Sequence, residues 1–101
     1  WVIIATRSHE SDAAALRVVV ESPAAYVGLL GSPRKVSLIF KALREEGMRE
    51  DLLARVYAPV GLDLGAETPE EIALSIMAEI IMLRQGGKGQ PLSARRRETD
   101  A

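Results

Sequence analysis

The sequence contains no cysteine, and its 101 residues include one histidine, one tryptophan, two tyrosines and one phenylalanine. Without cysteine, disulfides, thiolate metal sites and persulfide chemistry are excluded from these residues. A single histidine with no cysteine or second histidine near it makes a poor metal site, so we expect no bound metal. No apolar run approaches the roughly 18 to 20 residues that cross a membrane, and no signal peptide is visible. We therefore expect a cytoplasmic protein without a membrane anchor.

Charge of neither sign dominates, because 13 lysines and arginines stand against 14 aspartates and glutamates, for a formal net charge of −1. The sequence thus lacks the basic excess of proteins that bind nucleic acids or membrane surfaces. Its apolar fraction of 48% and charged fraction of 27% are typical of a globular protein. The length allows one domain at most. Because the chain starts at Trp1 and runs directly into an apolar segment, we expect it to be a piece of a longer protein.

Apolar segments alternate with amphipathic ones, which predicts an α/β fold. Three continuously apolar, strand-like segments occur at residues 1–5, 25–30 and 56–60. Helical patterns occur at residues 12–20, 33–46 and 68–84, with one short turn within 48–55. This order favours a parallel sheet with right-handed crossovers. We expect about half of a doubly wound domain, with three parallel strands, flanking helices and an unpaired apolar edge.

The extent of this partial domain is predicted as residues 1–84. In residues 85–101, Gly, Pro and Ser alternate with a run of arginines, which predicts a flexible C-terminal tail. The last helix begins at a capping box formed by Thr68 and Glu71 and is apolar around most of its circumference, so we expect it to be packed on several sides. Its one polar line contains Glu71, Ser75 and Glu79. A solvated face is the ordinary explanation of that line, and acid/base chemistry or a divalent ion is the alternative.

Ligands of open parallel sheets bind beyond the carboxyl ends of the strands, where loops and helix N-termini converge. Three loops leave such ends here, at residues 6–12, 28–35 and 59–68. The sequence therefore predicts that these loops gather on one rim, so that His9, Ser32 and Asp63 become neighbours.

The segment GLLGSPRK, residues 28–35, has the composition of an anion-binding turn. Its glycines permit close approach of the backbone, its serine offers a hydroxyl, and its basic residues stand at a helix N-terminus. An ordinary strand-to-helix corner, with Ser32 as the helix cap before Pro33, explains the same pattern, although basic residues oppose the dipole there. The residues concerned are Gly28, Gly31, Ser32, Arg34 and Lys35.

His9 and Asp63 are further candidates in these loops. His9 precedes the first expected helix, whose N-cap we assign to Ser11 or Asp12. It has the chemistry of a general base or of a hydrogen-bond donor to a ligand, and a solvated or Asp12-paired loop residue is the alternative. An Asx-turn after Gly61 explains Asp63 as well as ligand contact does.

Three segments, ATRSHESDAAAL, YVGLLGSPRK and PVGLDLGAETPEEIALSIMAEI, occur in this order and resemble the C-terminal Rossmann domain of the XdhC/CoxI family. The likeness covers roughly residues 1–92, and the last segment is the most specific. Proteins of that family are accessory factors that bind molybdenum cofactor and help insert it into xanthine dehydrogenase and related enzymes such as carbon monoxide dehydrogenase. The family's N-terminal domain and the first half of its Rossmann domain, with the glycine-rich turn, have no counterpart in this sequence. The resemblance therefore implies the C-terminal half of a Rossmann-like, doubly wound parallel sheet.

The resemblance implies a set of cofactor-binding residues, to which Lys35 is added from the anion-binding pattern. The set is Thr6, His9, Asp12, Gly28, Gly31, Ser32, Arg34, Lys35, Gly61 and Asp63. The implied protein is an accessory module that binds molybdenum cofactor, or a related phosphate-bearing ligand, and assists its insertion into a molybdoenzyme of the xanthine dehydrogenase or carbon monoxide dehydrogenase type.

Two other functions stay open at this point: an NAD(P)-binding fragment of an oxidoreductase, and a structural piece that completes the sheet of a partner. The sequence lacks a nucleophile with a base and an orienting group, which favours a protein without catalytic activity of its own. The edge at residues 2–4 is apolar on both faces, and pairing of two copies along it would give a continuous sheet twice as wide. A homodimer is therefore expected.

Overall fold

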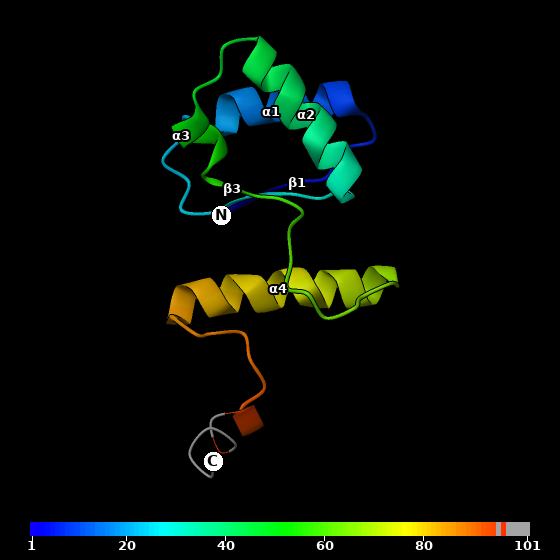
Figure 1. Ribbon diagram of the computed structural model, residues 1–101, viewed down its shortest axis with the longest axis vertical. Coiled ribbons are helices and arrows are strands. Elements are labelled where there is room, and N and C mark those ends of the chain that lie inside the picture. The colour runs from blue at the N-terminus through cyan, green and yellow to red at the C-terminus, as the bar shows by residue number, and fades with distance from the viewer. Residues whose placement is uncertain (95, 97–101) are drawn as a thin grey trace. The chain divides into compact units, whose positions relative to one another are not determined.

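The computed structural model describes residues 1–94 and 96, which fall into two compact units, Trp1–Val60 and Gly61–Ala101 (Figure 1). The first unit contains, in chain order, β1 (Val2–Ile4), α1 (His9–Val19), β2 (Val27–Leu29), α2 (Pro33–Glu45), α3 (Glu50–Leu53) and β3 (Val56–Tyr57). The second contains α4 (Pro69–Gln85). No helix in the described residues is both long and apolar enough to cross a lipid bilayer.

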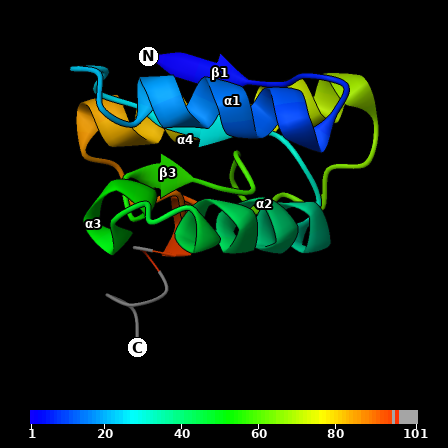
Figure 2. The same ribbon diagram turned by 90° about the horizontal axis from the view of Figure 1, so that it is seen from above.

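The first unit is built on a three-stranded parallel sheet in the order β1-β2-β3. Val27 of the central strand is level with Val2 of β1 and Val56 of β3. Helices α1 and α2 lie side by side (Figure 2) and their apolar residues share one core with the strands. The predicted fold class, three parallel strands with flanking helices, is confirmed. The outer edge of β1 has no strand partner within the described residues.

Strand β2 is apolar on both faces because both are covered. Val27 and Leu29 point into the core that β2 shares with the helices, where Leu16 of α1 is also completely buried. The opposite face carries the buried Tyr26, whose ring stacks on Trp1 and on Tyr57 with centroid separations of 5.3 and 4.9 Å. Stacking of the Trp1, Tyr26 and Tyr57 rings therefore links the three strand segments on that face.

Helix α1 begins earlier than the sequence predicted. Its N-cap is Ser8, whose Oγ accepts a hydrogen bond from the Ser11 amide at 3.1 Å, and His9 is the first helical residue. The assignment of the cap to Ser11 or Asp12 was wrong because Asp12 lies inside the helix, where its carboxylate is buried. In contrast, α2 starts as predicted, with Ser32 as N-cap and Pro33 in the first turn.

Strand β3 is shorter than the predicted segment 56–60. It ends at Tyr57, two residues before Pro59, which has no amide hydrogen to donate to a ladder. The Val60 amide nevertheless donates to the carbonyl of Leu29 at 3.0 Å, so the chain continues along β2 after the strand ends.

In the second unit, α4 begins at the predicted capping box. The Glu71 amide donates to Thr68 Oγ1 at 3.1 Å, and Glu71 Oε1 accepts from the Thr68 amide at 2.9 Å. Gly86 ends the helix in the left-handed conformation, with a φ of 72°. Residues 95 and 97–101 of the predicted tail lie outside the described residues, and the flexibility of the tail stays a prediction.

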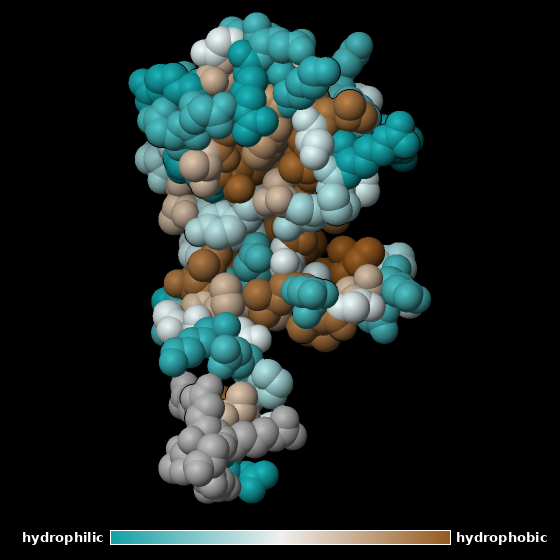
Figure 3. Space-filling model, viewed as in Figure 1, coloured by the Kyte–Doolittle hydropathy of each residue, from teal (hydrophilic) through white to brown (hydrophobic). Residues whose placement is uncertain are grey.

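Two of the three residues in the polar line of α4 do not face solvent, whereas Glu71, which belongs to the capping box, is exposed. Ser75 and Glu79 are buried, whereas Leu74, Met77 and Ile81 are exposed. Apolar surface is accordingly visible over the second unit in the space-filling view (Figure 3). A loop covers the polar line, because the Leu62 amide donates to the Ser75 carbonyl at 3.1 Å and the Gly61 amide to Glu79 Oε1 at 3.3 Å.

Candidate functional site

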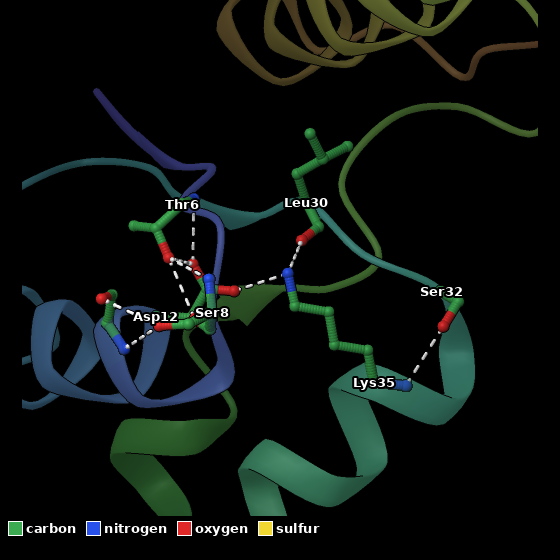
Figure 4. Close-up of polar contacts among 7 residues, drawn as sticks. Thr6, Ser8, Asp12, Leu30, Ser32 and Lys35 are labelled. Carbon is green, nitrogen blue, oxygen red and sulfur yellow. Dashed lines mark hydrogen bonds and ion pairs between the residues drawn. The ribbon is translucent and has the colours of Figure 1, made fainter.

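The loops after β1 and β2 are joined by a buried carboxylate. Asp12 projects from the first turns of α1 and accepts two hydrogen bonds at Oδ1, from the Thr6 amide at 3.0 Å and the Thr6 hydroxyl at 2.7 Å. Its Oδ2 lies 2.6 Å from the Lys35 ammonium, which also donates to the Leu30 carbonyl at 3.4 Å (Figure 4). Thr6 and Leu30 each follow the end of a strand. The Asp12–Lys35 pair therefore crosslinks two loops at the carboxyl edge of the sheet.

Electrostatics keep this carboxylate ionised. Burial by itself raises the pKa of the Asp12 carboxyl, but the close Lys35 ammonium and the hydrogen bonds from Thr6 outweigh burial, so the pKa of Asp12 lies below its usual value. The Asp12 side chain has no exposed surface, while that of Lys35 is 22% exposed. The charges of Asp12 and Lys35 therefore neutralise each other beneath the loops at the carboxyl edge of the sheet, where the Lys35 ammonium is paired with Asp12.

The two glycines of the GLLGSPRK segment lie close against neighbouring side chains of the unit. A Cβ on Gly28 would stand 2.7 Å from Val60 Cγ2 and 2.8 Å from Tyr26 Cε1, so the side chains on either side close over this backbone. A Cβ on Gly31 would stand 2.8 Å from Lys35 Cδ. Gly31 thus leaves room for the aliphatic stem of Lys35 to cross the turn toward Asp12.

The N-terminus of α2 carries the exposed part of the same segment. Ser32 Oγ accepts from the Lys35 amide at 3.2 Å, which orders the first turn. That turn contains no acidic residue, unlike the first turns of the other helices. Arg34 is exposed and forms no ion pair within the described residues. Arg34 is therefore a free cation beside the partial positive charge of a helix N-terminus, a combination that suits an anion.

His9 stands apart from the Asp12 network. It is exposed at the start of α1 and forms no hydrogen bond with Asp12, so the alternative of an Asp12-paired histidine does not hold within the described residues. The network instead includes Ser8, whose amide donates to the Thr6 hydroxyl oxygen at 3.4 Å. Sequence reasoning missed this role of Ser8. The signal that could have identified it is the spacing of Ser8 from Ser11 and Asp12, because a serine at a helix start caps the amides of the residues that follow.

Gly61 and Asp63 belong to the second unit. Gly61 has a φ of 106°, and a Cβ there would stand 2.5 Å from Ser75 Oγ, so its backbone lies directly on α4. Asp63 is exposed. The predicted gathering of the third loop with His9 and Ser32 on one rim stays a prediction.

A groove of about 650 Å3 in the first unit lies away from this rim. It lies by the C-terminal ends of α1 and α2, and its lining includes Arg17, Arg49 and Arg55. Each of these cations already has partners: Glu46 holds Arg17, Asp51 holds Arg49, and the carbonyls of Val20, Ser22 and Ala24 accept from Arg55. The groove therefore offers an anion no free positive charge comparable to Arg34.

The comparisons with known proteins agree on one family. The XdhC Rossmann domain matches residues 1–80. The uncharacterized protein YqeB of Escherichia coli K12 is 47% identical over 89 residues, which are 88% of this chain and 16% of YqeB. The molybdenum cofactor insertion chaperone PaoD of the same organism is 30% identical over 83 residues, which are 82% of this chain and 26% of PaoD.

A solved structure agrees with these relatives. The crystal structure of a xanthine dehydrogenase from Bacillus halodurans superimposes with a TM-score of 0.67 and 32% sequence identity, over 91% of this chain and 26% of that one. The chain thus spans between 16% and 26% of the length of these proteins.

Proposed function

This chain belongs to the family of XdhC Rossmann domains, and from that membership we propose that it is part of an accessory protein that binds molybdenum cofactor and assists its insertion into a molybdoenzyme. The observation that carries the proposal is the family match over residues 1–80. The likeness to PaoD, a chaperone named for this task, supports it. In this proposal the cofactor is cargo, so the chain has to hold and release it and needs no catalytic group.

The rim of the first unit fits the phosphate that the pterin of the cofactor carries. Arg34 supplies an exposed guanidinium, which forms paired hydrogen bonds to phosphate oxygens. Ser32 stands next to it at the N-terminus of α2, whose dipole favours negative charge. We assign the direct contacts to these two residues, with His9, the first residue of α1, as a further donor.

Asp12 and Lys35 act in this proposal as positioning residues. Their ion pair is buried beneath the rim and joins the loop after β1 to the turn after β2. Because the Lys35 ammonium is held 2.6 Å from Asp12, its charge is neutralised before a ligand arrives. The net attraction for an anion therefore comes from Arg34 and the helix N-terminus.

The proposed partner is a cytoplasmic molybdoenzyme of the xanthine dehydrogenase or carbon monoxide dehydrogenase type. The name of the Bacillus halodurans structure supports the former. An NAD(P)-binding role remains the competing hypothesis, because parallel sheets with a basic helix N-terminus also bind dinucleotides.

Anaerobic titration of the chain with molybdenum cofactor, NAD and NADP tests the proposal. We expect binding of the cofactor, and a loss of at least about tenfold in affinity for Arg34→Ala, since a charge-assisted pair is removed. Lys41→Ala is the matched control, because it removes an exposed cation further along α2, and it should bind as the wild type does.

The alternatives give different results. Tight NAD binding without cofactor binding would favour the oxidoreductase fragment, and binding of none of the three ligands would favour a structural piece. Cofactor binding that is equal in the wild type and Arg34→Ala would retain the function but reject the rim as its site.

A further inference from the structure

Helix α4 exposes an apolar stripe. Leu74, Met77 and Ile81 are 63%, 53% and 52% exposed, although they lie in the middle of a 17-residue helix. At about 100° per residue their side chains fall within roughly 60° of one another around the helix. Ser75, Ile76 and Glu79 are buried on the other side. A continuous apolar stripe of this kind, on a helix that buries the polar residues Ser75 and Glu79 on its other side, is characteristic of an interaction surface.

Opposite charges stand at the two ends of the stripe. Glu70 precedes Met77 by seven residues and Arg84 follows it by seven, so both lie on the same side of the helix as Met77. Both side chains are exposed, and neither forms an ion pair within the described residues. Glu71, the other acid of the first turn, is occupied in the capping box. The ends of the stripe are thus charged, unpaired and of opposite sign.

This arrangement is complementary to itself. If a second α4 runs antiparallel to the first and crosses it at Met77, Glu70 of each copy lies opposite Arg84 of the other. The same register places Ala73 opposite Ile81, so that a small residue faces a large one. We propose that the stripe Glu70, Ala73, Leu74, Met77, Ile81 and Arg84 forms the interface of a homodimer, with a two-fold axis at Met77.

Charge symmetry about Met77 selects a second copy over other occupants. An isologous contact requires each end of the surface to complement the other end, and the acid and the base of the stripe meet that requirement at equal distances from its centre. An unrelated helix places no such requirement on this surface. The expected contact is small, because one pair of helices buries less than the roughly 1,200 Å2 typical of stable complexes. We therefore expect dissociation in the micromolar range.

Sedimentation equilibrium on charge-reversed chains gives the sharpest test. Glu70→Arg alone and Arg84→Glu alone each place like charges at both ends of the homodimer, and each should weaken it by roughly tenfold. An equimolar mixture of the two variants pairs Arg with Glu at both ends again and should restore dimerisation to near the wild-type level. The double variant E70R/R84E should also dimerise as the wild type does. Failure of both the mixture and the double variant to recover overturns the inference.

The apolar centre provides a second test. Met77→Glu brings two carboxylates together at the axis and should leave a monomer, whereas Val18→Glu, at a 74% exposed position of α1, should leave the dimer intact. Both positions are exposed, so circular dichroism and the thermal midpoint should show folded chains. Because the chain has no cysteine, Met77→Cys also allows a single-site test. A bifunctional maleimide should crosslink it into dimers, and Val18→Cys should not be crosslinked.

Other occupants predict other outcomes. A dimer that survives Met77→Glu and dissociates in Val2→Pro would place the contact on the β1 edge and overturn the inference. A wild-type chain that is monomeric at about 100 µM would also overturn it, since an interface in the micromolar range is populated at that concentration.

Discussion

The Asp12–Lys35 pair should be energetically coupled and sensitive to pH. In Asp12→Asn the Lys35 ammonium loses its partner, and Thr6 keeps only a neutral acceptor. Removal of one member of a buried pair costs about 3–5 kcal/mol, but Lys35 is 22% exposed and regains some hydration. We therefore expect Asp12→Asn to lower the free energy of unfolding of the first unit by about 2–3 kcal/mol at pH 7.

Lys35→Met should cost more, about 3–4 kcal/mol, because the carboxylate that it leaves behind is completely buried. The double variant should cost clearly less than the two single changes added together, with a coupling energy of about 2 kcal/mol. Urea unfolding of the four chains measures these differences. A coupling energy below about 0.5 kcal/mol would refute the role of the pair in joining the two loops.

The pH dependence has a definite sign. The pKa of Asp12 is lowered in the folded chain, so its contribution is fully present above the unfolded value, near 3.8, and is lost as the pH falls through the folded value. The deficit of Asp12→Asn relative to the wild type should therefore be constant from pH 7 to about pH 5 and shrink below about pH 4. A deficit that is as large at pH 3 as at pH 7 would contradict this account.

Two further predictions concern local structure. Ser8→Ala should destabilise the chain by about 1 kcal/mol, because the Ser11 amide loses its acceptor at the start of α1; an equal loss on replacing the exposed Ser37 by alanine would reject Ser8 as the cap. Gly28→Ala should cost about 1–3 kcal/mol, because its Cβ would meet Val60 Cγ2 at 2.7 Å; thermal unfolding measures this, and a stability equal to that of the wild type would show that the sheet yields there without cost.

The family motifs in the sequence were sufficient to predict the family, because family membership is a property of the sequence. The site was harder to predict. Arg34 and Ser32 could be chosen from the GLLGSPRK segment alone, and the structure leaves both exposed. Lys35 was chosen for the same reason, but its ammonium lies on Asp12, which is distant in the sequence. No local pattern indicates which of two neighbouring cations is already paired.

Local chemistry determined where two of the helices begin. Ser32 with Pro33 and Thr68 with Pro69 start α2 and α4 as predicted, because a cap and a first-turn proline act within one turn of the chain. The apolar runs likewise predicted the three strands and their parallel order, and the central strand β2 is buried throughout, as an unbroken apolar segment requires.

Only the tertiary structure decided which polar residues are buried. Asp12 is buried inside α1, where Lys35 and Thr6 satisfy its carboxylate, and the helix starts at His9 because Ser8 caps it. Glu79 is buried because the Gly61 loop reaches it, which leaves Met77 facing outward. Helical periodicity identifies the faces of a helix, but contacts between segments far apart in the chain determine which face meets solvent.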